Sequence, residues 1–130
     1  MDLLHRTLEG FSPELYLAAL SRVAHSDGLH PDEQEMLDQH ACRLGIDLDD
    51  LPELPRDLSD LPWATRILVY RDAYMLALAD GLFSPEEEKY LAELAGRLKL
   101  SQEKVGSIQR WVRDCEGLLE RFDEILGNTE

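Results

Sequence analysis

Apolar residues recur at steps of three and four along most of the chain, which is the spacing of a helix that buries one face. Such stripes occupy residues 15–23, 36–44, 63–77, 90–98 and 105–126. None of the segments shows the alternation of apolar and polar positions, bounded by hairpin turns, that is typical of a β-strand. The pattern therefore predicts an all-α fold.

Residues that favour helix ends separate the stripes. Ser12-Pro13 and Ser84-Pro85 are typical of helix starts, because serine accepts a bond from a free amide and proline fits the first turn. Glu87, three residues after Ser84, completes the pattern of a capping box. Gly45 follows its stripe where a left-handed C-cap is common. For the helix that follows residue 61, the sequence predicts a cap at Ser59 or Asp60.

The segment 46–61 interrupts the helical pattern with two prolines and six acids. It predicts an irregular connector with one short turn of helix near Asp47. After Ser101, apolar residues from Val105 to Leu126 follow a seven-residue repeat, which predicts a long helix over about residues 101–126. Gly117 leaves a break in that helix open. The repeat is typical of a coiled-coil seam or, more commonly, of a long helix packed along its own domain.

An internal repeat relates the two halves of the chain. Residues 23–46 align with residues 76–100, and Asp27-Gly28 matches Asp80-Gly81 at an offset of 53. Each hairpin alone would leave an apolar face bare. We therefore expect one compact helical bundle over residues 1–130. It has two hairpins (about 12–45 and 62–100) related by a pseudo-two-fold axis, the acidic connector 46–61, and the long C-terminal helix.

The charge of the chain limits its partners. Thirteen basic residues face 27 acidic ones, which gives a net charge of −14. Such a surface repels nucleic-acid phosphates and anionic lipids, and attracts cations or a protein with a basic surface. A homodimer remains open. Neither a signal peptide nor a membrane-spanning stretch is recognisable, and the two cysteines form no CxxC pair. We therefore expect a cytoplasmic protein with no direct membrane insertion.

The two Asp-Gly turns carry the residues with metal-binding chemistry. Asp27, Glu33, Asp80 and Glu87 offer carboxylates, and His25 or His30 would add a nitrogen ligand for a transition metal. The structural alternative is that these acids cap helices and stabilise turns. A calcium-binding EF-hand is excluded, because Leu76 and Leu78 would occupy two of its ligand positions. We identify no catalytic motif and expect no catalytic residues.

The motifs LALADGLFSPEEE (76–88) and VAHSDGLHPDE (23–33) carry a family resemblance. Over roughly residues 12–115 the chain resembles the tellurite-resistance TerB-like family. This family includes the region that adjoins the J domain in a membrane-anchored co-chaperone. The resemblance implies a helical bundle without enzymatic activity. It also implies a role in tellurite resistance or metal stress, through protein partners and a bound divalent metal ion.

Three hypotheses of function follow. The first is a TerB-like module of a tellurite-resistance or metal-stress system, with a weak divalent-metal site at the Asp-Gly turns. The second is a metal-free interaction module or co-chaperone-type scaffold, which holds a basic partner through the acidic connector or the last helix. The third is a mimic of DNA, which rests on the charge alone.

Overall fold

The computed structural model describes residues 12–26, 31–78 and 84–127. Within these ranges the regular structure is helical and no strand occurs, which confirms the predicted all-α class. No helix in the described ranges is long and apolar enough to cross a membrane. The elements are α2 (Pro13–His25), α3 (Pro31–Leu44), the 3-10 turn η1 (Leu48–Asp50), α4 (Trp63–Ala77), α5 (Pro85–Arg97) and α6 (Gln102–Gly127).

The start of α5 has the predicted capping box. The Glu87 amide donates to the Ser84 hydroxyl over 3.0 Å, and the Ser84 amide donates to the Glu87 carboxylate over 3.2 Å. These two bonds satisfy amides that have no partner inside the helix. At α2 the Ser12 hydroxyl accepts from the amide of Leu15 at 3.4 Å. Both starts agree with the sequence prediction.

The start of α4 differs from the prediction. Pro62 occupies the N-cap position, and among the described residues no side chain caps this helix. The Ser59 hydroxyl donates instead to the Asp57 carboxylate at 2.5 Å, so it forms a local turn within the connector. The expected cap at Ser59 or Asp60 is therefore wrong. Proline can take this place because it has no amide hydrogen to satisfy.

Helices α3 and α5 end in the same way. Gly45 has φ +69° and Lys99 has φ +57°, so both residues adopt the left-handed conformation that ends many helices. The next amide then reaches back into the last turn: Ile46 donates to the Ala41 carbonyl and Leu100 to the Ala95 carbonyl, each over 3.0 Å. The two copies of the repeat thus share one C-terminal cap geometry, although only the first copy uses glycine.

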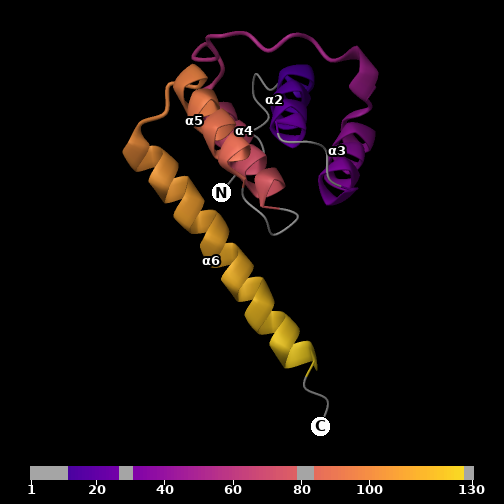
Figure 1. Ribbon diagram of the computed structural model, residues 1–130, viewed down its shortest axis with the longest axis vertical. Coiled ribbons are helices and arrows are strands. Elements are labelled where there is room, and N and C mark those ends of the chain that lie inside the picture. The colour runs from indigo at the N-terminus through magenta and orange to yellow at the C-terminus, as the bar shows by residue number, and fades with distance from the viewer. Residues whose placement is uncertain (1–11, 27–30, 79–83, 128–130) are drawn as a thin grey trace.

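The core lies where α2 and α4 pack against each other (Figure 1). Helix α3 packs against both of them, and so does α5. All four of these helices contribute side chains with almost no exposure. They include Leu17, Leu20, Leu37, Tyr70, Tyr74, Leu91 and Leu94, and Leu98 directly after α5 adds another. The apolar stripes of these four helices therefore meet in one core, as their spacing predicts.

The connector 46–61 is irregular apart from η1, as predicted, and it is fastened to α5. Leu54 and Leu58 are buried in the core, while the acids around them are exposed. The Leu58 amide donates to the Arg97 carbonyl at 2.8 Å, and the Arg97 guanidinium donates to the Leu54 carbonyl at 3.3 Å. These bonds account for buried backbone groups that a loop would otherwise leave unsatisfied.

Helix α6 is continuous through Gly117 but packs on its own domain over only half its length. Ile108 and Val112 are buried against α4, and two polar bonds fasten the same half. Gln109 donates to the Tyr70 hydroxyl at 3.0 Å and Arg113 to the Tyr74 hydroxyl at 2.9 Å. The other half extends away from the other helices (Figure 1).

The explanation that the whole helix packs along its own domain is therefore wrong, and helix lengths give the reason. At 1.5 Å per residue, the 26 residues of α6 span about 39 Å, whereas the 15 residues of α4 span about 22 Å. The domain is too short to cover the C-terminal end of α6.

Candidate functional site

The six residues predicted to bind metal fall into two groups. Asp27, His30 and Asp80 lie outside the described residues. His25, at the end of α2, is exposed, and its Nδ1 lies 2.7 Å from the carbonyl oxygen of Ser21. Its imidazole is therefore engaged with its own helix.

Glu33 and Glu87 are fully buried, with no exposed surface, and each lies in the first turn of its helix. One carboxylate oxygen of Glu87 accepts from the Ser84 amide; the other is buried and has no hydrogen-bond partner among the described residues. Within the same residues, no three His, Cys, Asp or Glu side chains come close enough to hold a metal ion. The metal site stays a prediction, because three of its six residues are not described.

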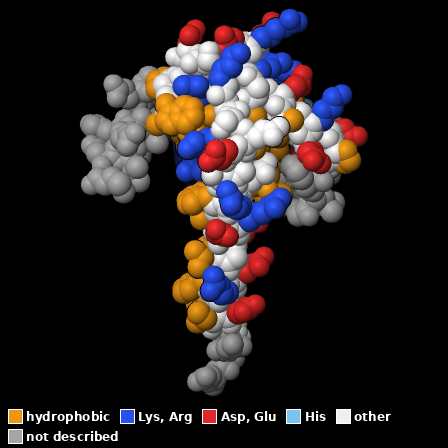
Figure 2. Space-filling view, turned by 90° about the vertical axis from the view of Figure 1, so that its left-hand side faces the viewer, with side chains coloured by type: hydrophobic (Ala, Val, Ile, Leu, Met, Phe, Trp, Pro, Cys, Tyr) orange, Lys and Arg blue, Asp and Glu red, His pale blue; other side chains and the backbone are white. Residues whose placement is uncertain are grey.

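An exposed apolar stripe runs along the free half of α6. It consists of five side chains that are each more than half exposed; we call them the distal stripe: Leu118, Leu119, Phe122, Ile125 and Leu126. In Figure 2, hydrophobic side chains line one edge of the projecting helix, and acidic side chains lie on the opposite edge. Contiguous apolar surface of this kind is unfavourable in water and is typical of interaction sites in proteins.

The distal stripe has two parts. Leu119, Phe122 and Leu126 continue the row that buries Ile108 and Val112 in the domain. A second row lies on one flank of the first, with members seven residues apart: Trp111, Leu118 and Ile125. The other flank carries polar residues at the same spacing: Gln109, Glu116 and Asp123. The helix is therefore apolar on the face toward its domain and on one flank only.

Two shallow hollows lie beside Trp111, whose side chain is 52% exposed. The first, of about 270 Å³, lies between α4 and α6 and is lined by Ile67, Arg71, Ser107, Ile108 and Trp111. The second, of about 330 Å³, is lined by Met36, His40, Arg71, Asp72, Met75 and Trp111. Trp111 and Arg71 form the ridge between them, and Met75, which is 39% exposed, widens the apolar surface.

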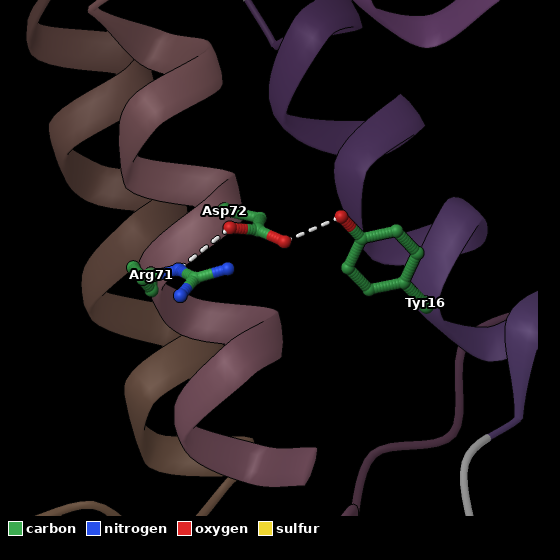
Figure 3. A network of polar contacts seen from close by, with 3 residues as sticks. All are labelled: Tyr16, Arg71 and Asp72. Carbon is green, nitrogen blue, oxygen red and sulfur yellow. Dashed lines mark hydrogen bonds and ion pairs between the residues drawn. The ribbon is translucent and has the colours of Figure 1, made fainter. Parts of the chain in front are cut away.

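A polar network positions Arg71 on that ridge (Figure 3). The Asp72 carboxylate accepts from the Tyr16 hydroxyl at 2.5 Å and from Arg71 Nε at 2.8 Å. The Arg71 guanidinium also lies 5.7 Å from the centre of the Trp111 ring, within the range of a cation–π contact. Asp72 and Trp111 therefore hold the Arg71 guanidinium on the ridge, where the carboxylate of Asp72 balances its charge.

Burial shifts the acid–base equilibria beside the second hollow. Burial raises the pKa of the Tyr16 hydroxyl far above its usual range, and the negative charge of Asp72 adds to the effect. Burial also lowers the pKa of His40, although Asp72 opposes this shift. The His40 ring packs edge-on against the Tyr16 ring, with 5.7 Å between their centres. The imidazole of His40 is thus partly buried beside this hollow.

A third hollow, of about 540 Å³, lies between α2, α3 and the connector. His25, Asp38, Asp47 and Asp49 contribute to its rim. All four side chains are exposed, so water solvates their charges. This rim is a solvated acidic surface.

The sequence interpretation missed the flank row of Trp111, Leu118 and Ile125. Their seven-residue spacing is readable in the sequence, but the repeat from Val105 to Leu126 has more members and indicates a single apolar row. The hollows beside Trp111 were not predictable. They depend on how α4 and α6 pack, since Met75 and Trp111 are far apart in the chain.

The chain matches no known protein family, no curated protein and no solved structure.

Proposed function

We propose that the protein is a non-enzymatic interaction module that binds a protein partner through the distal stripe of α6. One observation carries this proposal: five large apolar side chains, each 56–67% exposed, lie on a half-helix that projects from the domain. Burying one such side chain completely contributes about 1.5–3 kcal/mol. A partner that covers the stripe therefore gains a large apolar contribution from a small surface.

The helix itself also favours a bound state. In proteins most of the stability of a helix comes from the packing of its apolar face. The free part of α6 comprises the 13 residues 115–127, and its domain supplies few contacts to them. A partner on the distal stripe would stabilise both the helix and the complex.

A matched pair of variants tests this function. The stripe variant carries Leu118→Gln, Phe122→Gln and Ile125→Gln. The polar-face variant carries Asp114→Asn, Arg121→Gln and Glu124→Gln on the same half of the helix. In cells that make the protein, in-cell cross-linking with mass spectrometry should identify partners joined to α6. The stripe variant should lose these partners and the polar-face variant should keep them. Equal cross-linking of both variants would contradict the proposal.

A divalent-metal site at the two Asp-Gly turns is the second candidate, within a TerB-like arrangement of two hairpins related by a two-fold axis. Two observations favour it. Glu33 and Glu87 are fully buried at matching positions of the repeat, and α3 and α5 share the C-cap geometry of Gly45 and Lys99. A buried carboxylate oxygen on Glu87 is chemically suited to a cation.

Thermal unfolding distinguishes this site from capping alone. An ion at a hundred times its dissociation constant stabilises the native state by about 2.7 kcal/mol, which raises the melting temperature of a domain this size by roughly 8–13 °C. Calcium, magnesium, zinc and nickel should each be compared with sodium at the same ionic strength. In the double variant Asp27→Asn with Asp80→Asn the shift should disappear. If no divalent ion exceeds sodium, the metal site is absent.

A further inference from the structure

We infer that the partner on the distal stripe is a second copy of this chain, bound so that the two α6 helices run antiparallel along their full length. This inference rests on the proposed interaction function and names its partner. Each free half-helix then lies on the other copy, beside Trp111. The chain would be a symmetric dimer in which neither distal stripe is exposed.

The first argument is the shape of the apolar surface on α6. A helix that packed on one domain only would need a single apolar face. Here the domain-facing row continues into the free half, and one flank is apolar as well (Trp111, Leu118 and Ile125). The free half therefore needs two neighbours: a domain on one face and a helix on one flank. An antiparallel copy supplies both, because its α6 lies on the flank and its domain lies under the face.

The second argument is that the domain carries a surface able to receive the half-helix. The two hollows of about 270 and 330 Å³ open on the same flank of α6 as the apolar row, because Trp111 belongs to that row and lines both of them. Full overlap of two antiparallel α6 helices places Trp111 opposite Leu118 of the second copy. Apolar side chains of the stripe then lie over the hollows, beside Met75.

The third argument is charge. The first half of α6, residues 102–114, carries three bases and two acids, whereas the free half, residues 115–127, carries four acids and one base. The two halves thus have net charges of +1 and −3. An antiparallel pair brings each negative half beside a positive one. A parallel pair would align the two negative halves, in a protein whose net charge is already −14.

The fourth argument is the size of the contact. A stable protein interface involves about 20–30 residues from each partner. A parallel pairing of the free halves would use the 13 residues 115–127 of each chain. Full antiparallel overlap extends the contact along all 26 residues of α6 and adds the hollows between α4 and α6. The antiparallel arrangement therefore makes the longer contact of the two.

Sedimentation equilibrium of the purified chain tests the partner. Across the micromolar range, the wild-type protein should have twice the mass of one chain. The stripe variant should weaken the dimer by at least about a hundredfold, because it removes apolar contacts at both symmetric sites. The polar-face variant should stay within about threefold of wild type. Circular dichroism of the stripe variant checks that its domain is still folded.

Disulfide formation tests the orientation. In a background of Cys42→Ser and Cys115→Ala, one sample carries Lys104→Cys and another carries Ile125→Cys; both positions belong to the apolar flank and face each other in full antiparallel overlap. When mixed and oxidised, the two samples should form a disulfide between unlike chains. Ile125→Cys alone should form none, because residue 125 lies opposite residue 104 of the other copy, about 32 Å along the helix axis from its residue 125. A rapid disulfide between two Ile125→Cys chains would show a parallel pair and overturn the inference.

The remaining outcomes separate this inference from the proposed function. A wild-type chain that is monomeric at every concentration, or a stripe variant that still dimerises, overturns the antiparallel dimer. If stripe-dependent partners other than the chain itself are then found in cells, the interaction function stands with a different partner. If neither self-association nor such partners depend on the stripe, both proposals fail.

Discussion

At the scale of single residues, Ser84 shows how one side chain fixes a helix start. Its hydroxyl accepts the Glu87 amide, so Ser84→Ala should lower the free energy of unfolding by about 0.5–2 kcal/mol. The matched control is Ser107→Ala, because the exposed Ser107 hydroxyl donates only to the Glu103 carbonyl. Urea denaturation should show a lower midpoint for Ser84→Ala alone. Equal midpoints for the two variants would mean that the hydroxyl of Ser84 does not act as a cap.

Lys99 is a position where a substitution should raise, rather than lower, the free energy of unfolding. It adopts a left-handed conformation (φ +57°) that costs a residue with a Cβ about 1–2 kcal/mol. Lys99→Gly should therefore raise the free energy of unfolding, by about 0.5–1 kcal/mol after the greater freedom of glycine in the unfolded chain is counted. Gly45→Ala, at the equivalent position of the other copy, should lower it. Both changes are measurable in the same denaturant series, and a destabilised Lys99→Gly protein would contradict the shared cap geometry.

His40 gives the native state a dependence on pH. Burial lowers its pKa below the usual 6.5, so folding favours the neutral ring. The stability that depends on the neutral ring is complete above about pH 6.5 and is lost as the pH falls through the lowered native pKa. From about pH 7.5 to about pH 5.5, the free energy of unfolding should fall more for wild type than for His40→Gln. Denaturant titrations at both pH values measure this difference, and equal slopes would contradict it.

Some residue-level features were readable in the sequence and others were not. The caps at Ser12 and Ser84 depend on neighbouring residues, so a local pattern suffices to predict them. The cap at Pro62 was missed because Ser59 bonds to Asp57 in an equally local alternative. The sequence marks Glu33 and Glu87 as candidate metal ligands, but their complete burial depends on packing between helices and has no local signal.

At the scale of elements, leucines of equal spacing differ in what they contact. Leu94 of α5 has no exposed surface, whereas Leu119 of α6 is 66% exposed. Leu94→Ala should therefore cost about 2–5 kcal/mol of folding stability. At concentrations where the chain is monomeric, Leu119→Ala should change it by no more than about 0.5 kcal/mol. Thermal or urea unfolding compares the two; a large loss in Leu119→Ala would show that the free half packs on its own domain.

The contrast between buried Leu94 and exposed Leu119 shows which part of the fold the sequence could predict. Helical spacing identifies which residues share a face, so the described helices lie where the pattern predicts them. It does not state what covers that face. The repeat in α6 is equally regular before and after Arg113, yet only the first half is buried, because the domain ends there. That boundary follows from the lengths of α4 and α6 together and cannot be read from either alone.

In the molecule as a whole, one helix projects from a domain of packed helices (Figure 1). The net charge of −14 opposes association between copies in general. Only a local surface with apolar contact and the opposite charge can overcome it, and α6 combines both in one element: a bare stripe in its negative half and the Trp111 ridge beside its positive half. The antiparallel orientation of the two α6 helices, rather than the amount of apolar surface, then determines that a second copy fits.

Amide hydrogen exchange of residues 115–127, measured at two protein concentrations, distinguishes a covered half-helix from a free one. In the monomer this half-helix opens readily, so its amides exchange fast. In the antiparallel dimer it is covered, so its exchange should slow markedly as the concentration rises. Exchange of α5 serves as the internal control and should change little, because none of its residues lines the two hollows beside Trp111. Fast exchange of residues 115–127 at both concentrations would contradict the central claim that a second copy covers this helix.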